Sequence, residues 1–339
     1  MNVDIALDFG SSSTRIMIFG KDDIFEEPSA AAYDVTSGEL IAFGKEAFDM
    51  VGRTSERIKI IYPIEKGVVT DFDAALAMTK YFLRKVTSKK MLSGRAVLNI
   101  PEGISDLEIY NLVSLVNFAG IKKVYLINTC KAALIGAGCD ILAPRGRFCI
   151  DIGAGSTKLG VMSLGSDSSV RRAELCGGAL DDLVIKYAKT KYNLLIGRHT
   201  ARTAKEKLCS AREPSDLLFY KLKGRNIKTG LPSAVEISNF ELLSMSENFA
   251  AEISLLIQGA LNGARPEIVS DIYTNGIVIT GGASDMTDLD RYIETRLDIK
   301  TVHPENSRLC VIKGCERAFA MLKNDEKLSP LRLASTKMS

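Results

Sequence analysis

Two short segments of this chain nearly repeat each other, and the repeat limits the folds that the chain can adopt. Residues 7–15 read LDFGSSSTR and residues 150–158 read IDIGAGSTK. In each, an apolar stretch ends in Asp, and a turn rich in Gly and hydroxyl groups leads into a second apolar stretch, which is typical of a β-hairpin. The backbone N–H groups and hydroxyls of such a turn can bind phosphate, and Asp8 or Asp151 can hold a hydrated divalent cation through its waters. The duplication therefore predicts two half-sites that bind one nucleotide.

A protein kinase is one alternative for the first segment, because Asp8-Phe9-Gly10 spells the metal-binding tripeptide of that class. In a kinase, this tripeptide follows a Gly-rich loop and a Lys that lie well upstream. Here the tripeptide begins at residue 8, which leaves no room for either. We therefore do not expect a protein kinase.

The composition is that of an ordinary globular protein and argues against several other classes. The 339 residues suggest about two domains, and 46% of them are hydrophobic and 25% charged. A formal net charge of +3, without a run of basic residues interleaved with aromatics, argues against nucleic acid as a partner. No apolar stretch approaches the roughly 20 residues of a membrane-spanning helix. We therefore expect a cytoplasmic protein that does not cross a membrane.

Cysteine and histidine are poorly placed for metal or triad chemistry. The seven cysteines include no C-x-x-C pair and lie mostly in apolar or helical stretches, so we expect buried thiols in a reducing cytosol. His199 and His303 are the only histidines, and neither belongs to an H-E-x-x-H pattern. Zinc catalysis therefore lacks ligands, and a Ser-His-Asp triad has few candidates.

Apolar strands alternate with helices on both sides of the second near-repeat. The predicted strands are 97–100, 124–127 and 277–280, and the predicted helices are 105–120, 131–138, 181–192, 200–209, 238–261 and 313–322. Capping boxes begin two helices, at Ser105 and Ser238. Leu107 and Phe118 are expected on the buried face of the first of these, together with Leu112, Leu115 and Val116. The alternation predicts an α/β fold with sheets covered on both faces, and the polar tail from residue 323 is expected to be disordered.

The two hairpins, the small-residue helix between them and the late Thr280-Gly281-Gly282 together resemble the superfamily of actin, sugar kinases and heat-shock chaperone ATPases. Within it, the chain most resembles the MreB-like bacterial actins over most of residues 3–322. The stretches that carry the resemblance are 62–69, 71–72, 99–105, 132–138, 176–178, 195–197, 224–226, 230–232 and 280–282.

The resemblance implies a duplicated actin-like ATPase fold, an α/β fold with two lobes around a nucleotide cleft. Each lobe would be a mixed sheet flanked by helices. Lobe I would comprise residues 1–145, with a small inserted subdomain at about 30–70, and would be completed by about 313–323. Lobe II would comprise residues 146–312, with an inserted subdomain at about 182–240, and 324–339 would be a polar tail.

The resemblance also implies a site for ATP and Mg²⁺. Asp8 and Asp151 would hold the waters around the metal ion, and Lys205 with Glu206 would border the base and ribose. Gly281 and Gly282 would let the backbone lie against the adenosine. The residues implied to contact ATP are Gly10, Ser11, Ser12, Ser13, Arg15, Gly153, Ala154, Gly155, Ser156, Lys205, Glu206, Gly281, Gly282 and Ala283. Arg15 replaces a residue that is usually apolar in MreB but falls where actin has a phosphate-contacting Lys; an exposed Arg without a role is the alternative.

One departure from the family concerns catalysis. MreB carries Glu-Glu-Pro where this chain has Asn128-Thr129-Cys130, and the second Glu is the residue expected to polarise the attacking water. Thr129 stands in its place, and a hydroxyl cannot accept a proton near neutral pH. We therefore expect ATP binding with weak or no hydrolysis, unless another residue orients the water.

The resemblance further implies self-assembly into filaments, contact with the inner face of the cytoplasmic membrane, and membrane-bound cell-wall elongation proteins as partners. The loop 88–95 is the local candidate for membrane contact, since Met91 and Leu92 could insert beside basic residues that meet anionic lipid. The alternative is a solvent-exposed loop that makes no membrane contact and whose apolar pair packs against the rest of the protein.

Other functions fit less well. A small-molecule kinase lacks a sugar-site motif, a chaperone ATPase would need a peptide-binding domain, and a plasmid-segregating actin lacks the MreB-like stretches. A hydrolysis-deficient MreB paralogue that acts as a nucleotide-locked scaffold remains the strongest alternative to the main shape protein.

Overall fold

The computed structural model describes residues 3–87, 94–324 and 331–334. The chain divides into two compact units, each of which is described by itself. Unit 1 comprises residues 1–145, 162–171 and 308–339, and unit 2 comprises 146–161 and 172–307. In the part of the chain that the structure describes, no helix is both long and apolar enough to cross a membrane.

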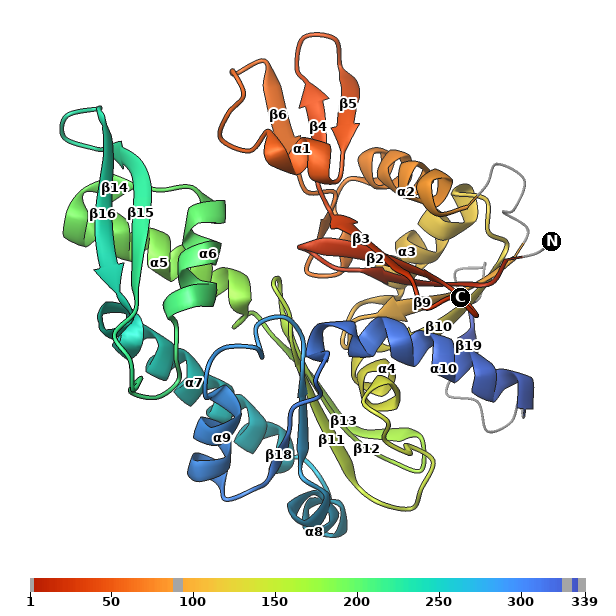
Figure 1. Ribbon diagram of the computed structural model, residues 1–339. Helices are drawn as coiled ribbons and strands as arrows, with labels where there is room; N and C mark the ends of the chain where they lie inside the picture. The colour runs from red at the N-terminus through yellow and green to blue at the C-terminus, as the bar shows by residue number, and fades with distance from the viewer. Residues whose placement is uncertain (1–2, 88–93, 325–330, 335–339) are drawn as a thin grey trace. The chain divides into compact units, whose positions relative to one another are not determined.

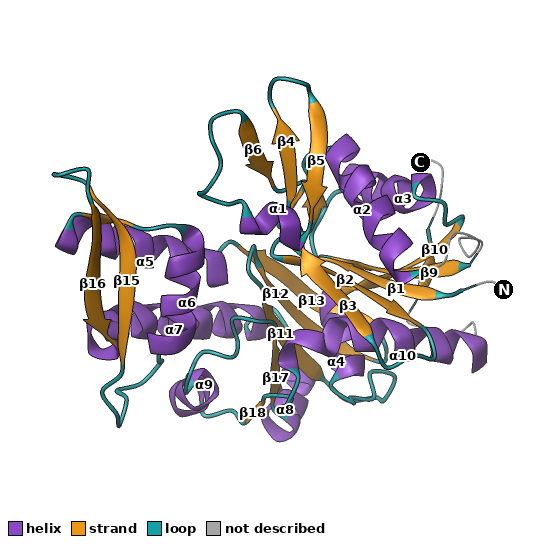
Figure 2. Ribbon diagram, turned by 45° about the horizontal axis from the view of Figure 1, so that its top comes forward, coloured by secondary structure: helices purple, strands orange, loops and turns teal. Residues whose placement is uncertain are grey.

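Unit 1 is built on a six-stranded mixed sheet in the order β19-β10-β9-β1-β2-β3. β1, β9 and β10 are parallel, whereas β2, β3 and β19 are antiparallel to their neighbours. Helices α2 and α3 cover one face and α4 and α10 the other (Figure 1, Figure 2). The bounds are β1 Ile5–Phe9, β2 Ser13–Ile18, β3 Ile24–Pro28, β9 Arg95–Ile100, β10 Lys123–Asn128, β19 Arg332–Leu333, α2 Phe72–Val86, α3 Asp106–Phe118, α4 Thr129–Gly136 and α10 Cys310–Asn324.

A small three-stranded sheet, in the order β5-β4-β6, adjoins this body together with a short helix and a two-stranded hairpin. The elements are β4 Ala31–Asp34, β5 Glu39–Phe43, α1 Lys45–Asp49, β6 Ile58–Ile61, β7 Ile64–Glu65 and β8 Val68–Val69. Alanines fill its small core, which consists of Ala30, Ala32, Ala42 and Ala47.

Unit 2 is built on a five-stranded sheet in the order β13-β12-β11-β17-β18, in which β11, β17 and β18 are parallel. A separate sheet, β14-β15-β16, extends from it with α5 and α6 (Figure 2). The bounds are β11 Arg147–Ile152, β12 Thr157–Ser163, β13 Ser166–Ala173, α5 Gly177–Tyr192, β14 Leu194–Leu195, α6 Arg198–Leu208, β15 Phe219–Asn226, β16 Pro232–Ser238, α7 Asn239–Leu261, α8 Pro266–Asn275, β17 Ile277–Thr280, α9 Leu289–Leu297, β18 Thr301–Val302 and the 3₁₀ turn η1 Ser307–Leu309. The end of β12 and most of β13, within residues 162–171, group with unit 1, as does η1 from Arg308 onward.

Both predicted capping boxes are confirmed, at Ser105 with Glu108 and at Ser238 with Glu241. Glu241 also links α7 to α5 within unit 2. Its carboxylate accepts hydrogen bonds from the Tyr187 hydroxyl at 2.7 Å, the Lys191 ammonium at 2.7 Å and the Tyr192 hydroxyl. Partial burial opposes ionisation, but these donors outweigh it and lower the pKa of Glu241 to about 2.

Two predictions about unit 1 are wrong. Leu107 and Phe118 are 54% and 66% exposed, because they lie about three turns apart on the same side of α3, away from the buried Leu112, Leu115 and Val116. The tail is not wholly disordered: β19 pairs with β10, and the Ala334 N–H donates to the Val124 carbonyl at 2.9 Å. Two apolar residues flanking Arg332 were too weak a signal for an edge strand.

All seven cysteines lie in the described part of the chain, and no disulfide joins them there. Six are buried and Cys139 is half-buried, which agrees with the predicted thiols.

Candidate phosphate-binding loops

The first near-repeat is the β1–β2 hairpin of unit 1, in which Asp8 lies opposite Arg15. The Gly10 N–H donates to the Ser13 carbonyl at 3.1 Å and so closes the turn. A Cβ on residue 10 would lie only 2.8 Å from that carbonyl oxygen, which explains the glycine. The Ser29 hydroxyl fixes the turn from the side by donating to the Gly10 carbonyl at 2.6 Å, and the Ser11 hydroxyl accepts from the Lys66 N–H at 2.6 Å.

The second near-repeat, between β11 and β12 of unit 2, closes in the same way. The Gly153 N–H donates to the Ser156 carbonyl at 3.1 Å. Two further backbone bonds attach this turn to the first residues of α5, from Gly177 N–H to the Gly153 carbonyl and from Gly178 N–H to the Ala154 carbonyl, both at 2.9 Å. The Ser156 hydroxyl is buried and has no hydrogen-bond partner among the described residues, so the turn retains an unused polar group of the kind that a phosphate oxygen satisfies.

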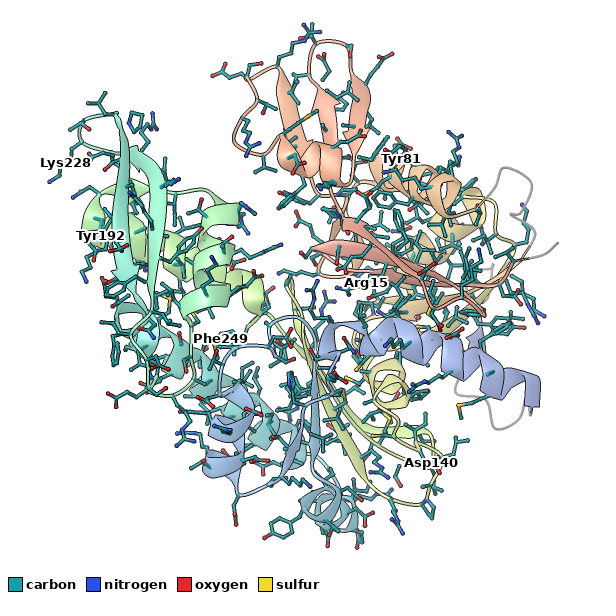
Figure 3. The ribbon with its side chains drawn as sticks, viewed as in Figure 1. Arg15, Tyr81, Asp140, Tyr192, Lys228 and Phe249 are labelled. Carbon is teal, nitrogen blue, oxygen red and sulfur yellow. The ribbon has the colours of Figure 1, made fainter. Side chains whose placement is uncertain are left out.

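Asp8 is held by two side chains of unit 1. The Arg15 guanidinium lies 3.2 Å from Asp8 Oδ2 and 2.8 Å from Glu26 Oε1, and the Asn99 amide donates to Asp8 Oδ1 at 2.9 Å. Arg15 is therefore not an exposed residue without contacts; Figure 3 shows it on the β1–β2 hairpin. Burial alone would lower the pKa of Arg15, but the Asp8 and Glu26 carboxylates raise it above its usual value. For Glu26 the attraction of Arg15 outweighs burial and lowers the pKa.

Asp151 is held by an equivalent set in unit 2. The Lys158 ammonium lies 3.1 Å from Asp151 Oδ2, and the Thr280 hydroxyl donates to Asp151 Oδ1 at 3.3 Å. Lys158 follows Asp151 by seven residues, as Arg15 follows Asp8 by seven. Lys158 was not among the predicted site residues, although Arg15 and Lys158 end the two aligned segments.

The two aspartates do not fit the predicted Mg²⁺. Each carboxylate faces a fixed cation that would repel a metal ion, and each of its oxygens already accepts one hydrogen bond, which leaves fewer lone pairs for the waters of a metal ion. Across the described residues, no group of three or more His, Cys, Asp or Glu side chains is arranged to hold a metal ion.

Other predicted residues of unit 2 lie beside the second loop. Gly281 has a φ of +91°, and a Cβ there would lie 2.5 Å from the Ile152 carbonyl oxygen, so only glycine fits. The Ala283 N–H donates to the same carbonyl at 3.0 Å, whereas Gly282 is exposed. Lys205 on α6 donates to the Gly177 carbonyl at 2.9 Å and pairs with the buried Asp181 at 2.7 Å.

Glu206 does not join this arrangement, because it is exposed on the next position of α6. The residue that pairs with Lys205 is Asp181, which the sequence analysis did not single out. The signal available was its place in the first turn and a half of α5, three residues after Gly178.

Thr129 begins α4 in unit 1 and is 2% exposed. Its hydroxyl lies 3.0 Å from Asn99 Oδ1 and 3.2 Å from the Ile100 carbonyl oxygen, and donates to them. Asn99 therefore links Thr129 to Asp8. The next residue, Cys130, donates its N–H to Glu102 Oε1 at 2.6 Å, so a buried carboxylate caps this helix. The predicted membrane-contact residues Met91 and Leu92 lie outside the described residues.

Comparisons with known proteins agree with this architecture. The family model of the MreB/Mbl protein matches residues 2–327. The cell shape-determining protein Mbl of Bacillus subtilis is 32% identical over 335 residues, which is 98% of this chain and 99% of that protein. The cell shape-determining protein MreB of Escherichia coli is 31% identical over 328 residues, 94% of each chain.

Solved structures give the same result. The crystal structure of MreB5 of Spiroplasma citri bound to AMPPNP has a TM-score of 0.91 at 30% identity and covers 96% of this chain and 98% of its own. The double helical filament of MamK shares the fold at 18% identity, with a TM-score of 0.78 over 95% and 99% of the two chains. The chain therefore has the actin-like fold and belongs to the MreB/Mbl family of cell shape-determining proteins.

Proposed function

We propose that this protein binds ATP through the turns of its two near-repeats and assembles into filaments that organise cell-wall synthesis and cell shape. The matched closure of the turns, from Gly10 N–H to Ser13 and from Gly153 N–H to Ser156, carries the proposal. Each turn places small residues and hydroxyls beside a fixed cation, which is the chemistry that phosphate groups require. MreB5 of Spiroplasma citri, at 30% identity, was crystallised with both AMPPNP and ADP, which supports a nucleotide as the ligand.

Titration calorimetry with ATP, ADP and AMP tests the nucleotide site. If both turns bind phosphate, affinity falls as phosphates are removed, and AMP binds at least about tenfold more weakly than ATP, since one charge-assisted contact is worth that much. Equal affinity for the three nucleotides would show that the turns are not phosphate sites.

Turnover is proposed to be weak. Thr129 donates its hydroxyl proton to Asn99 and Ile100, so it does not accept a proton from water. Loss of a positioned base typically slows a reaction by about 10²–10⁴-fold. Because ATP would then persist in the assembled protein, a nucleotide-locked scaffold paralogue is the second candidate, and the contacts of Thr129 are the observation that favours it.

Filaments of the proposed kind lie in the cytoplasm at the inner face of the membrane, with the wall-elongation proteins as partners. A contact that repeats head to tail without closing generates such a filament. The MreB/Mbl membership supports this proposal, and the likeness to MamK adds only the fold.

The proposed membrane contact is tested with the Met91→Ser, Leu92→Ser double variant in co-sedimentation with anionic liposomes. We expect binding to fall, because two apolar side chains no longer enter the acyl region. A control that changes Leu195 and Leu217, both exposed in unit 2, to Ser should keep its binding. Unchanged binding of the Met91, Leu92 variant would exclude this loop.

A further inference from the structure

The two near-repeats share a feature that nucleotide binding alone does not explain, namely a basic residue paired to the aspartate of the same hairpin. Arg15 lies 3.2 Å from Asp8, and Lys158 lies 3.1 Å from Asp151. All four side chains are largely buried, with exposures of 15% and 10% in the first pair and 14% and 7% in the second. Partly buried charges are screened less than surface charges, so these pairs fix the local potential.

The Lys158 ammonium lies at the phosphate-binding turn itself. A Cβ built on Gly153 would be 3.2 Å from Lys158 Nζ and 3.0 Å from the Ser156 carbonyl oxygen. A phosphate that contacts the Gly153 turn therefore meets this ammonium directly. Arg15 lies opposite Asp8 in the first hairpin and follows it by seven residues, as Lys158 follows Asp151.

Without Arg15 and Lys158, a hydrated divalent cation would be needed to neutralise the negative charge of the aspartates and the phosphates. A cation next to each carboxylate repels a metal ion and, at the same time, supplies the positive charge that the phosphates need. The matched pairing in both units makes a chance surface contact a poor explanation, and neither pair is exposed.

We propose that Arg15 and Lys158 take the place of a divalent cation at the two phosphate-binding turns, so that this protein binds nucleoside triphosphate in Mg²⁺-free solution. The proposal rests on the proposed nucleotide site and adds to it the source of positive charge. The nucleotide is recognised as its free polyanion.

The test is calorimetric titration of the full chain with AMPPNP, once in excess MgCl₂ and once in excess EDTA. We expect similar dissociation constants in the two solutions. Lys158→Gln should weaken binding in EDTA by about 10- to 100-fold, the worth of one charged hydrogen bond, and by less in MgCl₂. Lys158→Arg, which keeps the charge, should bind like the wild type in both.

The matched control is Lys228→Gln, which removes a lysine charge from an exposed position of unit 2, labelled in Figure 3, and should leave both dissociation constants unchanged. Circular dichroism reports whether Lys158→Gln is folded. If it is not, the dissociation constants of the wild type and Lys158→Arg in MgCl₂ and in EDTA still test the proposal. Binding in MgCl₂ that is lost in EDTA would overturn the inference and leave the nucleotide site standing. Absence of binding in both solutions would instead overturn the proposed function.

Discussion

The Asn99 side chain connects the two most informative positions of unit 1, and its removal gives a quantitative test of that network. Its Nδ2 donates to Asp8 Oδ1 at 2.9 Å, its Oδ1 accepts from Thr129 at 3.0 Å, and the residue is 8% exposed. Asn99→Ala removes one charge-assisted hydrogen bond, worth about 1.5–3 kcal/mol, and one neutral bond, worth about 1 kcal/mol. We expect the free energy of unfolding to fall by about 2–4 kcal/mol.

The assay is urea denaturation followed by far-ultraviolet circular dichroism, because the chain has no tryptophan for fluorescence. The matched control is Asn117→Ala on α3, since the Asn117 Oδ1 is buried without a hydrogen-bond partner among the described residues. This control should cost less than about 1 kcal/mol. An Asn99→Ala loss no greater than that of Asn117→Ala would refute the network.

Three further predictions concern acid stability, helix packing and turnover. Glu241→Gln should lower the free energy of unfolding by about 1–2 kcal/mol at pH 7, allowing for solvent screening, and by almost nothing near pH 2, as urea titrations at the two pH values measure. The pKa of Glu241 is about 2 in the folded protein against an ordinary 4.5. Its stabilisation is therefore complete above pH 4.5 and is lost as the pH falls toward 2. Gly314→Ala should cost about 1–3 kcal/mol or more in thermal unfolding, because its Cβ would lie 1.7 Å from the Ala132 carbonyl oxygen. Gly197→Ala has open space around it and loses only the N-cap preference for Gly, so it should cost less, about 0.5–1 kcal/mol. Thr129→Glu should raise phosphate release by about 10²-fold and Thr129→Gln should not; an equal response to both would remove the base from the explanation.

The structural features that depend on residues close together in the chain were predicted correctly. The capping boxes at Ser105 and Ser238 are confirmed because each depends on residues three positions apart. The strand 277–280 is confirmed because three consecutive apolar residues and Thr280 form a fully buried strand. The turns at Gly10 and Gly153 were found because their closure needs glycine at a fixed place.

Features that depend on distant partners could not be predicted in this way. The pairing of Lys205 with Asp181 and the link from Asn99 to both Asp8 and Thr129 join residues far apart in the chain. Phe118 shows that hydrophobicity alone does not predict burial. Its position around α3 turns it away from the core, and its ring lies edge-to-face with that of Phe72.

The central claim is that nucleotide held by the two turns drives assembly, and electron microscopy on lipid monolayers with ATP, ADP or no nucleotide tests it most directly. We expect filaments with ATP that persist, because turnover is weak, and fewer or none without nucleotide. Absence of filaments in all three states would contradict the cytoskeletal function, and equal filaments in all three would contradict the role of the nucleotide.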